Sequence, residues 1–257
     1  MMTDDIFTDY VVGDIHGCYD ELEDLLVEII KDSWDLTLKV RVWCIGDLID
    51  KGPKANQVLE RIFLRELQNV QIFSILGNHE EKFLRWCKAQ DREDAGGKKN
   101  EVTDRWAFAA IRDFQPFIEA LPLYKLFPEY NVLLVHGGID PRMTELPSPS
   151  LMEANKYQKN ILRLRYVSSD GRMIPLGDEN PEEGDRWWAD VYDGRFGTIV
   201  YGHQASDNVQ YHPHAIGLDT GCVYGNKLSA LRLSLDGNHK LIQVNAKEKY
   251  AKAYDEE

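Results

Sequence analysis

The chain has 257 residues, of which 43% are hydrophobic, and a formal net charge of −13. This length and apolar content are enough for a substantial core, and we expect one domain over 1–246 followed by a charged C-terminal tail over 247–257. The acidic balance opposes adhesion to nucleic acid and to anionic lipid, which excludes a general nucleic-acid coat protein. An anionic substrate is still compatible with this charge, because bound divalent cations would reverse the field locally.

The residue pattern also bears on the cellular setting. No apolar run approaches the length needed to span a bilayer, and the first nine residues carry acids, where a secretory signal would carry basic and then apolar residues. We therefore expect a cytoplasmic protein. The four cysteines, Cys18, Cys44, Cys87 and Cys222, lack CxxC spacing, so we interpret them as reduced packing residues and not as zinc or disulfide ligands.

Three strand–loop–helix units are predicted in the first third of the chain. Each has a short apolar run that ends at a glycine and is followed by apolar residues at helical spacing. The predicted strands are 10–12, 40–45 and 70–76, and the helices that follow them are 19–31, 55–67 and 80–89. Such repeats predict a layered α/β fold in which ligands gather at the carboxyl ends of the strands.

The rest of the chain is less regular. A charged, exposed loop is predicted over 91–101, and the next helix, over 103–121, ends at Pro122. Proline, serine and glycine residues over 141–149 and 167–185 predict loops or a lid, and the charged end of the chain from 247 predicts a frayed terminus. The remaining predicted strands are 131–135, 198–201, 215–218, 228–235 and 241–244. The Asp236-Gly237-Asn238 turn predicts that the last two strands form a hairpin.

Four short motifs carry potential metal ligands on glycine-rich turns: GDIHG from Gly13, GDLID from Gly46, GNHE from Gly77 and HGG from His136. A carboxylate can bridge two cations, and the Asp of the second motif is our predicted bridge. The predicted ligands are Asp14 and His16 for the first ion, Asp47 as the bridge, and Asn78, His136 and His203 for the second ion. This mixture of oxygen and nitrogen ligands favours two transition-metal ions, manganese first, with iron, zinc or cobalt as alternatives, over calcium or magnesium.

His79 has a different predicted role from its neighbour Asn78, because adjacent side chains of extended backbone point in opposite directions. We expect His79 to face the substrate as a general acid, with Asp50 holding its imidazole in the donating form. The nucleophile would be a hydroxide held between the two metals.

Each predicted metal ligand could also have an ordinary structural role. Asp14 and Asp47 could cap the helices that follow them, and Asn78 could be a turn residue. His136 and His203 could be core histidines with satisfied hydrogen bonds. The arrival of all these residues at strand ends favours the metal site.

Together, the motifs resemble those of the calcineurin-like metallophosphoesterases, and within them the phosphoprotein-phosphatase branch, whose hallmarks are GDxHG, GDxxDRG, GNHE, HGG and a late histidine. The resemblance implies a layered fold with two central mixed β-sheets flanked by helices. It also implies the same six metal ligands, with His79 and Asp50 as the acid pair. One departure is Lys51 in place of arginine, which replaces a planar fork for phosphate with a point charge.

The later half is more similar to the bacterial symmetrical diadenosine tetraphosphatases and their relatives. The likeness lies in Leu162–Tyr166 with Asp170-Gly171-Arg172, and in Leu218–Leu228. The second motif, in contrast, keeps the Asp50 that is typical of protein phosphatases. Candidate contacts for substrate phosphate are Lys51, Arg165 and Arg186.

The sequence therefore predicts a dimetal hydrolase of phosphate esters or phosphoanhydrides. A dinucleoside polyphosphate is the first expected substrate class, with no membrane and no general nucleic-acid partner. A protein serine/threonine phosphatase with the same metals is the alternative activity. A metal-free binding module that keeps the fold is the alternative from another class.

Overall fold

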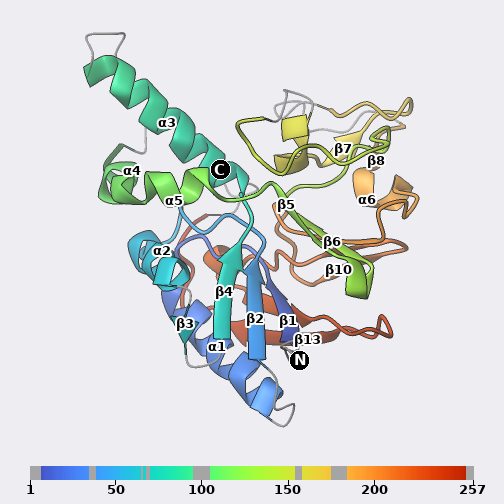
Figure 1. The fold of residues 1–257 in the computed structure, drawn as a ribbon, viewed down its shortest axis with the longest axis horizontal. Helices are drawn as coiled ribbons and strands as arrows, with labels where there is room; N and C mark the ends of the chain where they lie inside the picture. The colour runs from blue at the N-terminus through green and yellow to red at the C-terminus, as the bar shows by residue number, and fades with distance from the viewer. Residues whose placement is uncertain are drawn as a thin grey trace, which may run out of the picture.

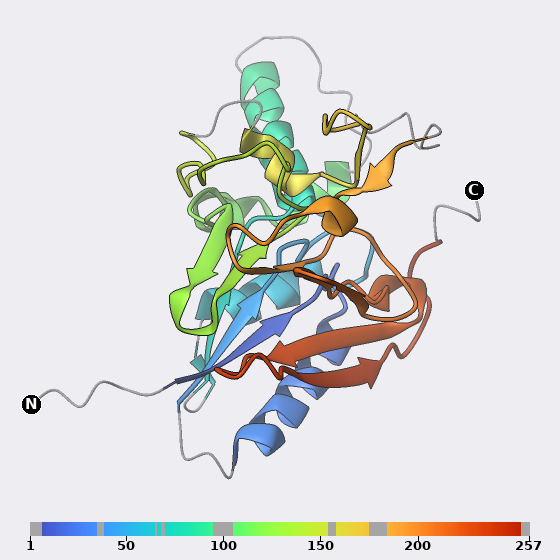
Figure 2. The same cartoon turned by 90° about the vertical axis from the view of Figure 1, so that its right-hand side faces the viewer.

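The computed structural model describes residues 7–34, 39–64, 66–67, 70–94, 105–153, 158–174 and 184–252. Two central β-sheets organise the described chain, with helices over the outer face of the first sheet (Figures 1 and 2). The predicted fold of two mixed sheets flanked by helices is confirmed.

The first sheet has six strands in the order β13-β12-β1-β2-β4-β3. Its strands are β1 (Phe7–Val12), β2 (Lys39–Cys44), β3 (Glu66–Leu67), β4 (Val70–Ser74), β12 (Lys227–Arg232) and β13 (Lys240–Asn245). The central strands β1, β2 and β4 are parallel, whereas β3, β12 and β13 pair antiparallel with their neighbours. The carboxyl ends of the three parallel strands therefore meet at one edge.

The second sheet has five strands in the order β10-β11-β9-β6-β5. Its strands are β5 (Tyr124–Phe127), β6 (Val132–Val135), β9 (Thr198–Tyr201), β10 (Gln210–His212) and β11 (Ala215–Gly217). The central strands β6, β9 and β11 are parallel. A separate two-stranded sheet joins β7 (Tyr166–Val167) to β8 (Arg186–Trp187).

The helices are mostly short. They are α1 (Tyr19–Ser33), α2 (Ala55–Leu64), α3 (Asn78–Asp94), α4 (Arg105–Ala110), α5 (Gln115–Glu119) and α6 (Trp188–Val191). Single 3-10 turns are η2 (Arg112–Phe114), η3 (Pro128–Tyr130), η4 (Gln158–Leu162) and η5 (Cys222–Tyr224). In Figure 1, α1 and α2 lie beside the first sheet, and α3 extends away from it.

The core follows from the alternation of side chains along β1. Tyr10 and Val12 belong to the apolar cluster that includes α1 and α2, whereas Val11 packs with residues of both sheets, such as Val132 and Val200. All three β1 side chains are buried, as expected for a parallel strand that is covered on both faces. This two-sided packing fixes the strand ends, and with them the loops that follow.

Several boundaries differ from the prediction. The helix predicted to reach Leu67 ends at Leu64, and β3 follows it. The described part of the predicted 103–121 helix is broken into α4, η2 and α5, and Pro116, which lacks a backbone N–H, lies in the first turn of α5. Residues 95–104, which include most of the predicted loop and the predicted helix start, lie outside the described residues.

The frayed terminus predicted from residue 247 is wrong for the described part of that segment. The backbone N–H groups of Tyr250 and Ala251 both donate to the Val223 carbonyl, and the Lys247 N–H donates to the buried Glu21. These bonds hold the segment against the start of α1, while 253–257 lie outside the described residues. The predicted hairpin is confirmed, because β12 and β13 pair antiparallel across Gly237, whose φ is 77°.

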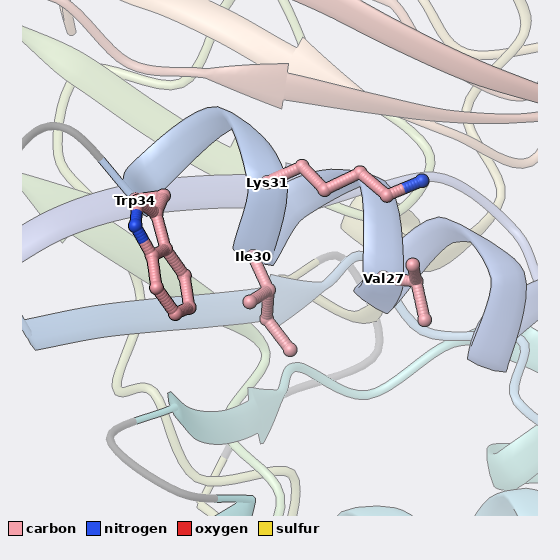
Figure 3. Close-up of a pocket in the computed structure, with 4 residues that line it drawn as sticks. All are labelled: Val27, Ile30, Lys31 and Trp34. Atoms are coloured by element: carbon pink, nitrogen blue, oxygen red, sulfur yellow. The ribbon is translucent and has the colours of Figure 1, made fainter.

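The surface of α1 carries an exposed apolar patch. Val27, Ile30 and Trp34 lie along one side of the helix, beside Lys31, and line a shallow pocket (Figure 3). Trp34 is 78% exposed. Among the described residues, the helices are too short or too polar to cross a bilayer.

Candidate active site

The loops after five parallel strands converge at one edge of the two sheets. Asp14 and His16 follow β1, and Asp47 follows β2. Asn78 begins α3 after β4, while His136 and His203 follow β6 and β9. Hydrogen bonds and close polar contacts connect these residues, so the structure brings all six predicted ligands together.

The backbone of these loops is strained. Among the described non-glycine residues, six have positive φ, and five of them belong to these loops. The five are His16 (46°), Asp47 (48°), Asp50 (72°), Lys51 (65°) and His203 (70°). Each such conformation costs on the order of 1–3 kcal/mol and persists only where the surrounding structure imposes it. The fold thus pays a conformational cost to direct these particular side chains inward.

Asp47 lies at the centre of the cluster. Its carboxylate belongs to two groups of potential metal ligands, one with His16 and His79 and one with His136 and His203, and the ligand atoms of each group lie within 4.8 Å of one another. Oδ2 is 3.5 Å from the Nε2 atom of His16, and Oδ1 is 3.3 Å from that of His136. One carboxylate can therefore contribute an oxygen to each of two neighbouring cations.

Asn78 and Asp14 complete the cluster. The side-chain oxygen of Asn78 lies 2.8 Å from His136 Nε2 and 2.7 Å from His203 Nδ1. Asp14 accepts the backbone N–H of His203 at 3.0 Å. The approach of Asp14 requires a glycine at residue 202, because a Cβ there would collide with the Asp14 carboxylate.

The histidine rings are oriented as metal ligands require. The Nδ1 atoms of His16 and His136 each lie 3.0 Å from a backbone carbonyl, which leaves both Nε2 atoms facing the cluster. The buried Nε2 of His203 has no hydrogen-bond partner among the described residues. The nitrogen that faces the Asn78 oxygen is instead Nδ1, so His203 would bind a metal through Nδ1, whereas His16 and His136 would bind through Nε2. This mixture of imidazole, carboxylate and amide donors fits a divalent transition metal.

The electrostatics of the cluster reflect buried charges that lie close together. Burial and the charges of Asp219 and Asp47 raise the pKa of Asp14 well above its usual range. Burial alone would also raise the pKa of Asp47, but His136 and His79 hold it well below its usual range. Burial and the Lys51 ammonium lower the pKa of His16 to about 3. A neutral imidazole is the form that binds metal.

His79 lies at the margin of the cluster. Its Nδ1 is 2.7 Å from Asp50 Oδ2, and its Nε2 is 3.8 Å from Asp47 Oδ2. Burial works against ionisation of Asp50, yet the bond to His79 and the nearby Lys82 lower its pKa. The ionised Asp50 therefore orients the ring so that Nε2 faces the cluster, and His79 is also close enough to His16 and Asp47 to join a group of ligands.

The helix-capping alternative assigned Asp14 and Asp47 to the helices that directly follow them, α1 and α2, and the hydrogen bonds do not bear it out in that form. Asp47 Oδ1 accepts the backbone N–H of His79, in the first turn of α3, at 2.9 Å. In contrast, the residue that caps α1 is Cys18 and not Asp14, and its side chain makes no capping hydrogen bond. Asp47 thus combines a bond at a helix start with a position between two groups of ligands.

Glu80 is a buried residue that supports the cluster. We predicted no role for it from the sequence. Its two carboxylate oxygens accept backbone N–H groups from Asp47, Leu48, Ile49 and Gly77 at 2.8–3.3 Å. Burial and the charge of Asp47 raise its pKa to about 7. Its place in the GNHE motif was the available signal, and its role is to hold two ligand loops together.

The three candidate substrate contacts are placed differently. Lys51 Nζ lies 2.7 Å from the Tyr224 hydroxyl and 3.1 Å from His16 Nε2, inside the cluster. Arg165 lies close enough for its charge to lower the pKa of the buried His203, and its own buried Nε has no hydrogen-bond partner among the described residues. Arg186 is an exposed residue of β8.

Arg163 is a second residue that the sequence reasoning did not assign. Its guanidinium donates to the backbone carbonyl of Asn78 at 3.2 Å and to the Glu81 carboxylate at 2.6 Å. It therefore ties the segment after η4 to the start of α3. The only sequence signal was its place between Leu162 and Tyr166, beside the arginine that we did select.

A family model for calcineurin-like phosphoesterases matches residues 10–244. This chain belongs to that family and is a hydrolase of phosphoesters or phosphoanhydrides. Membership implies a dimetal centre, and the donor set described above fits one.

Two relatives and one solved structure are similar to this chain over most of its length. The chain is 30% identical to the asymmetrical bis(5'-nucleosyl)-tetraphosphatase PrpE of Halalkalibacterium halodurans, over 86% of this chain and 88% of that protein. It is 28% identical to the symmetrical bis(5'-nucleosyl)-tetraphosphatase of Erwinia tasmaniensis, over 93% and 98%. A crystal structure provisionally described as a diadenosine tetraphosphatase superposes with a TM-score of 0.67 at 26% identity, covering 93% of each chain.

Proposed function

We propose that this protein is a manganese-dependent hydrolase of dinucleoside tetraphosphates and that the cluster around Asp47 is its active site. The observation that carries this proposal is the position of Asp47 in two groups of potential ligands. Asp14 and His16 would hold one ion, and Asn78, His136 and His203 the other, with Asp47 shared. The two bound ions would supply the charge that neutralises phosphate oxygens and lowers the pKa of an attacking water.

The residues around the ions have separate tasks. His79, supported by Asp50 at 2.7 Å, donates a proton through Nε2 to the leaving phosphate oxygen. Because Asp50 is ionised, it stabilises the imidazole in the orientation that donation requires.

Two cations of the chain would position the anionic substrate. Arg165, with an unpaired buried Nε, donates to a non-bridging phosphate oxygen. The Lys51 ammonium donates to the Tyr224 hydroxyl at 2.7 Å and adds a positive charge beside His16. Arg186 would contribute little, because it is exposed to solvent.

Support for the substrate class comes from the relatives. Both the asymmetrical and the symmetrical tetraphosphatases match this chain over most of their length. The favoured alternative activity is phosphoserine or phosphothreonine hydrolysis, because Asp50 is the residue typical of the phosphoprotein-phosphatase motif. The two activities use the same cluster and differ in the substrate that reaches it.

The test compares kcat/KM for diadenosine tetraphosphate and a phosphoserine peptide with manganese present, and identifies the nucleotide products. We expect kcat/KM to be at least about tenfold higher for the dinucleotide, equivalent to about 1.4 kcal/mol of transition-state binding. Two ADP molecules would mark symmetrical cleavage, and AMP with ATP would mark asymmetrical cleavage. A clear preference for the peptide would replace our proposal with the protein-phosphatase activity.

A further inference from the structure

A second cluster of potential metal ligands lies at the start of α1. Cys18 precedes the helix, Glu21 lies in its first turn, and Cys222 begins η5, more than 200 residues further along the chain. Their ligand atoms lie within 4.8 Å of one another. All three side chains are at most 1% exposed.

The Glu21 carboxylate is only half satisfied. Oε1 accepts the backbone N–H of Lys247 and the hydroxyl of Tyr250, each at 2.8 Å. Oε2 is buried and has no hydrogen-bond partner among the described residues. A buried carboxylate oxygen without a partner is costly, so this atom indicates a missing ligand between it and the two sulfur atoms.

The spacing of the three atoms fits a tetrahedral cation. Zn²⁺ binds thiolate sulfur at about 2.3 Å and carboxylate oxygen at about 2.1 Å, so its ligand atoms lie roughly 3.6–3.8 Å apart. Separations of at most 4.8 Å would close to this range with movements of about 1 Å. Two sulfur ligands also favour a thiophilic ion over manganese.

We propose that Cys18, Glu21 and Cys222 form a binding site for a thiophilic divalent cation such as Zn²⁺, separate from the cluster around Asp47. Binding forms two metal–sulfur bonds and one metal–oxygen bond, and the protons of the two thiols pass to solvent. A disulfide between Cys18 and Cys222 accounts for the sulfur atoms but leaves Glu21 Oε2 unpaired. A cation accounts for all three.

The site has a route to solvent and a structural consequence. A pocket of about 340 Å³ borders the site and is lined by Cys18, Glu21, Lys54, Lys247 and Tyr250, among others, although not by Cys222; water from this side would supply the fourth ligand. An ion there joins two segments, the start of α1 and the η5 turn before β12, and Glu21 also accepts hydrogen bonds from the C-terminal segment. It would therefore stiffen the loop that carries Asp14 and His16.

The test uses Co²⁺ as a spectroscopic substitute for Zn²⁺ in the full-length protein. The cluster around Asp47 offers only oxygen and nitrogen atoms, so a sulfur-to-cobalt charge-transfer band in the near ultraviolet reports the thiol site alone. With the cluster around Asp47 first loaded with manganese, we expect the band to saturate at one equivalent of Co²⁺ per chain and to disappear when Zn²⁺ is added. We expect no band in Cys222→Ser and a weaker, later-saturating band in Glu21→Gln.

Cys87→Ser is the matched control, because Cys87 is a buried thiol of α3 outside the cluster and the band should persist in this variant. Circular dichroism establishes that each variant is folded.

A wild-type protein without the band would overturn the proposal, as would a band that survives in folded Cys222→Ser protein. A Cys18–Cys222 disulfide with no cobalt band would replace the metal site with a redox pair. Manganese-supported turnover of p-nitrophenyl phosphate is measured separately, so failure of this site is distinguishable from failure of the proposed function.

Discussion

The two sides of the proposed active site are built differently. The ligand side consists of short loops at the ends of parallel strands, where Asp47 and His16 are buried and held in strained backbone conformations. The proposed substrate side consists of the segment after β6, whose described residues have little regular structure and include Arg165, a candidate phosphate contact, and Arg163. Both arginines lie in the short irregular connection between η4 and β7, elements of five and two residues.

This difference separates the residues that would carry out the reaction from those that would select the substrate. Metal ligands must be positioned closely, which strand ends fixed in a two-sided core can achieve. Substrate contacts on long connecting segments can vary without disturbing that core. A symmetrical and an asymmetrical tetraphosphatase both match this chain over most of their length, which is consistent with such a division.

The largest expected effect lies on the ligand side. Asp47→Asn removes the charge of the shared carboxylate, and we expect turnover of p-nitrophenyl phosphate to fall by about 10³-fold or more, because several kcal/mol of charge stabilisation are lost. Asp193→Asn, which changes an exposed acid paired with Arg195, is the control and should leave turnover unchanged. Wild-type rates in Asp47→Asn would contradict the bridging role.

His79→Asn tests the general acid. We expect kcat to fall by about 10²–10⁴-fold, the usual contribution of a positioned acid, while bound manganese stays at the wild-type level. Metal analysis and steady-state kinetics on the same preparation check both points, and His214→Asn, at an exposed histidine, is the matched control. Loss of metal together with activity would instead make His79 a ligand.

Glu80→Gln tests whether this carboxylate holds the two ligand loops in place. An amide offers one acceptor oxygen where the carboxylate accepts N–H groups with both, so backbone donors of the two ligand loops lose a partner. We expect manganese affinity to fall by about 10–100-fold, as for other residues that hold ligands in place. Calorimetric titration measures this, with Glu60→Gln, at an exposed carboxylate of α2, as the control. An unchanged affinity would show that the loops hold their geometry without Glu80.

The smallest effects are expected on the substrate side, where two arginines should differ. Arg165→Ala should raise KM for diadenosine tetraphosphate by about tenfold or more, since a charge-assisted hydrogen bond contributes about 1.5–3 kcal/mol. Arg186→Ala, at an exposed residue, should change KM by less than about twofold. Equal effects of the two substitutions would remove Arg165 from the proposed site.

The sequence predicted which residues gather in the cluster around Asp47 far better than it predicted what surrounds them. Strand periodicity followed by glycine and a polar side chain is a local signal, and it located Asp14, Asp47 and Asn78 without knowledge of the fold. The function of Glu80 was not visible, because its partners are backbone N–H groups of another loop. Cys18 and Cys222 lacked a signal altogether, since the fold alone brings such distant residues together.

Helix boundaries were the least predictable part of the fold. The apolar spacing over 103–121 is helical, but Pro116 removes a backbone donor, and the described part of that region forms separate short segments. The terminal segment from Lys247 was predicted to be frayed from its charge alone. Its attachment depends on a buried acceptor, Glu21, which comes from the opposite end of the chain.

The most direct test of the account is the number of manganese ions bound per chain, measured by elemental analysis after dialysis. Cys222→Ser protein is used so that the thiol cluster does not contribute. We predict two ions per chain in this background and at most one after Asp47→Asn is added, with turnover lost in parallel. An active protein with fewer than two ions, or an Asp47→Asn protein that keeps both ions and its activity, would contradict the account.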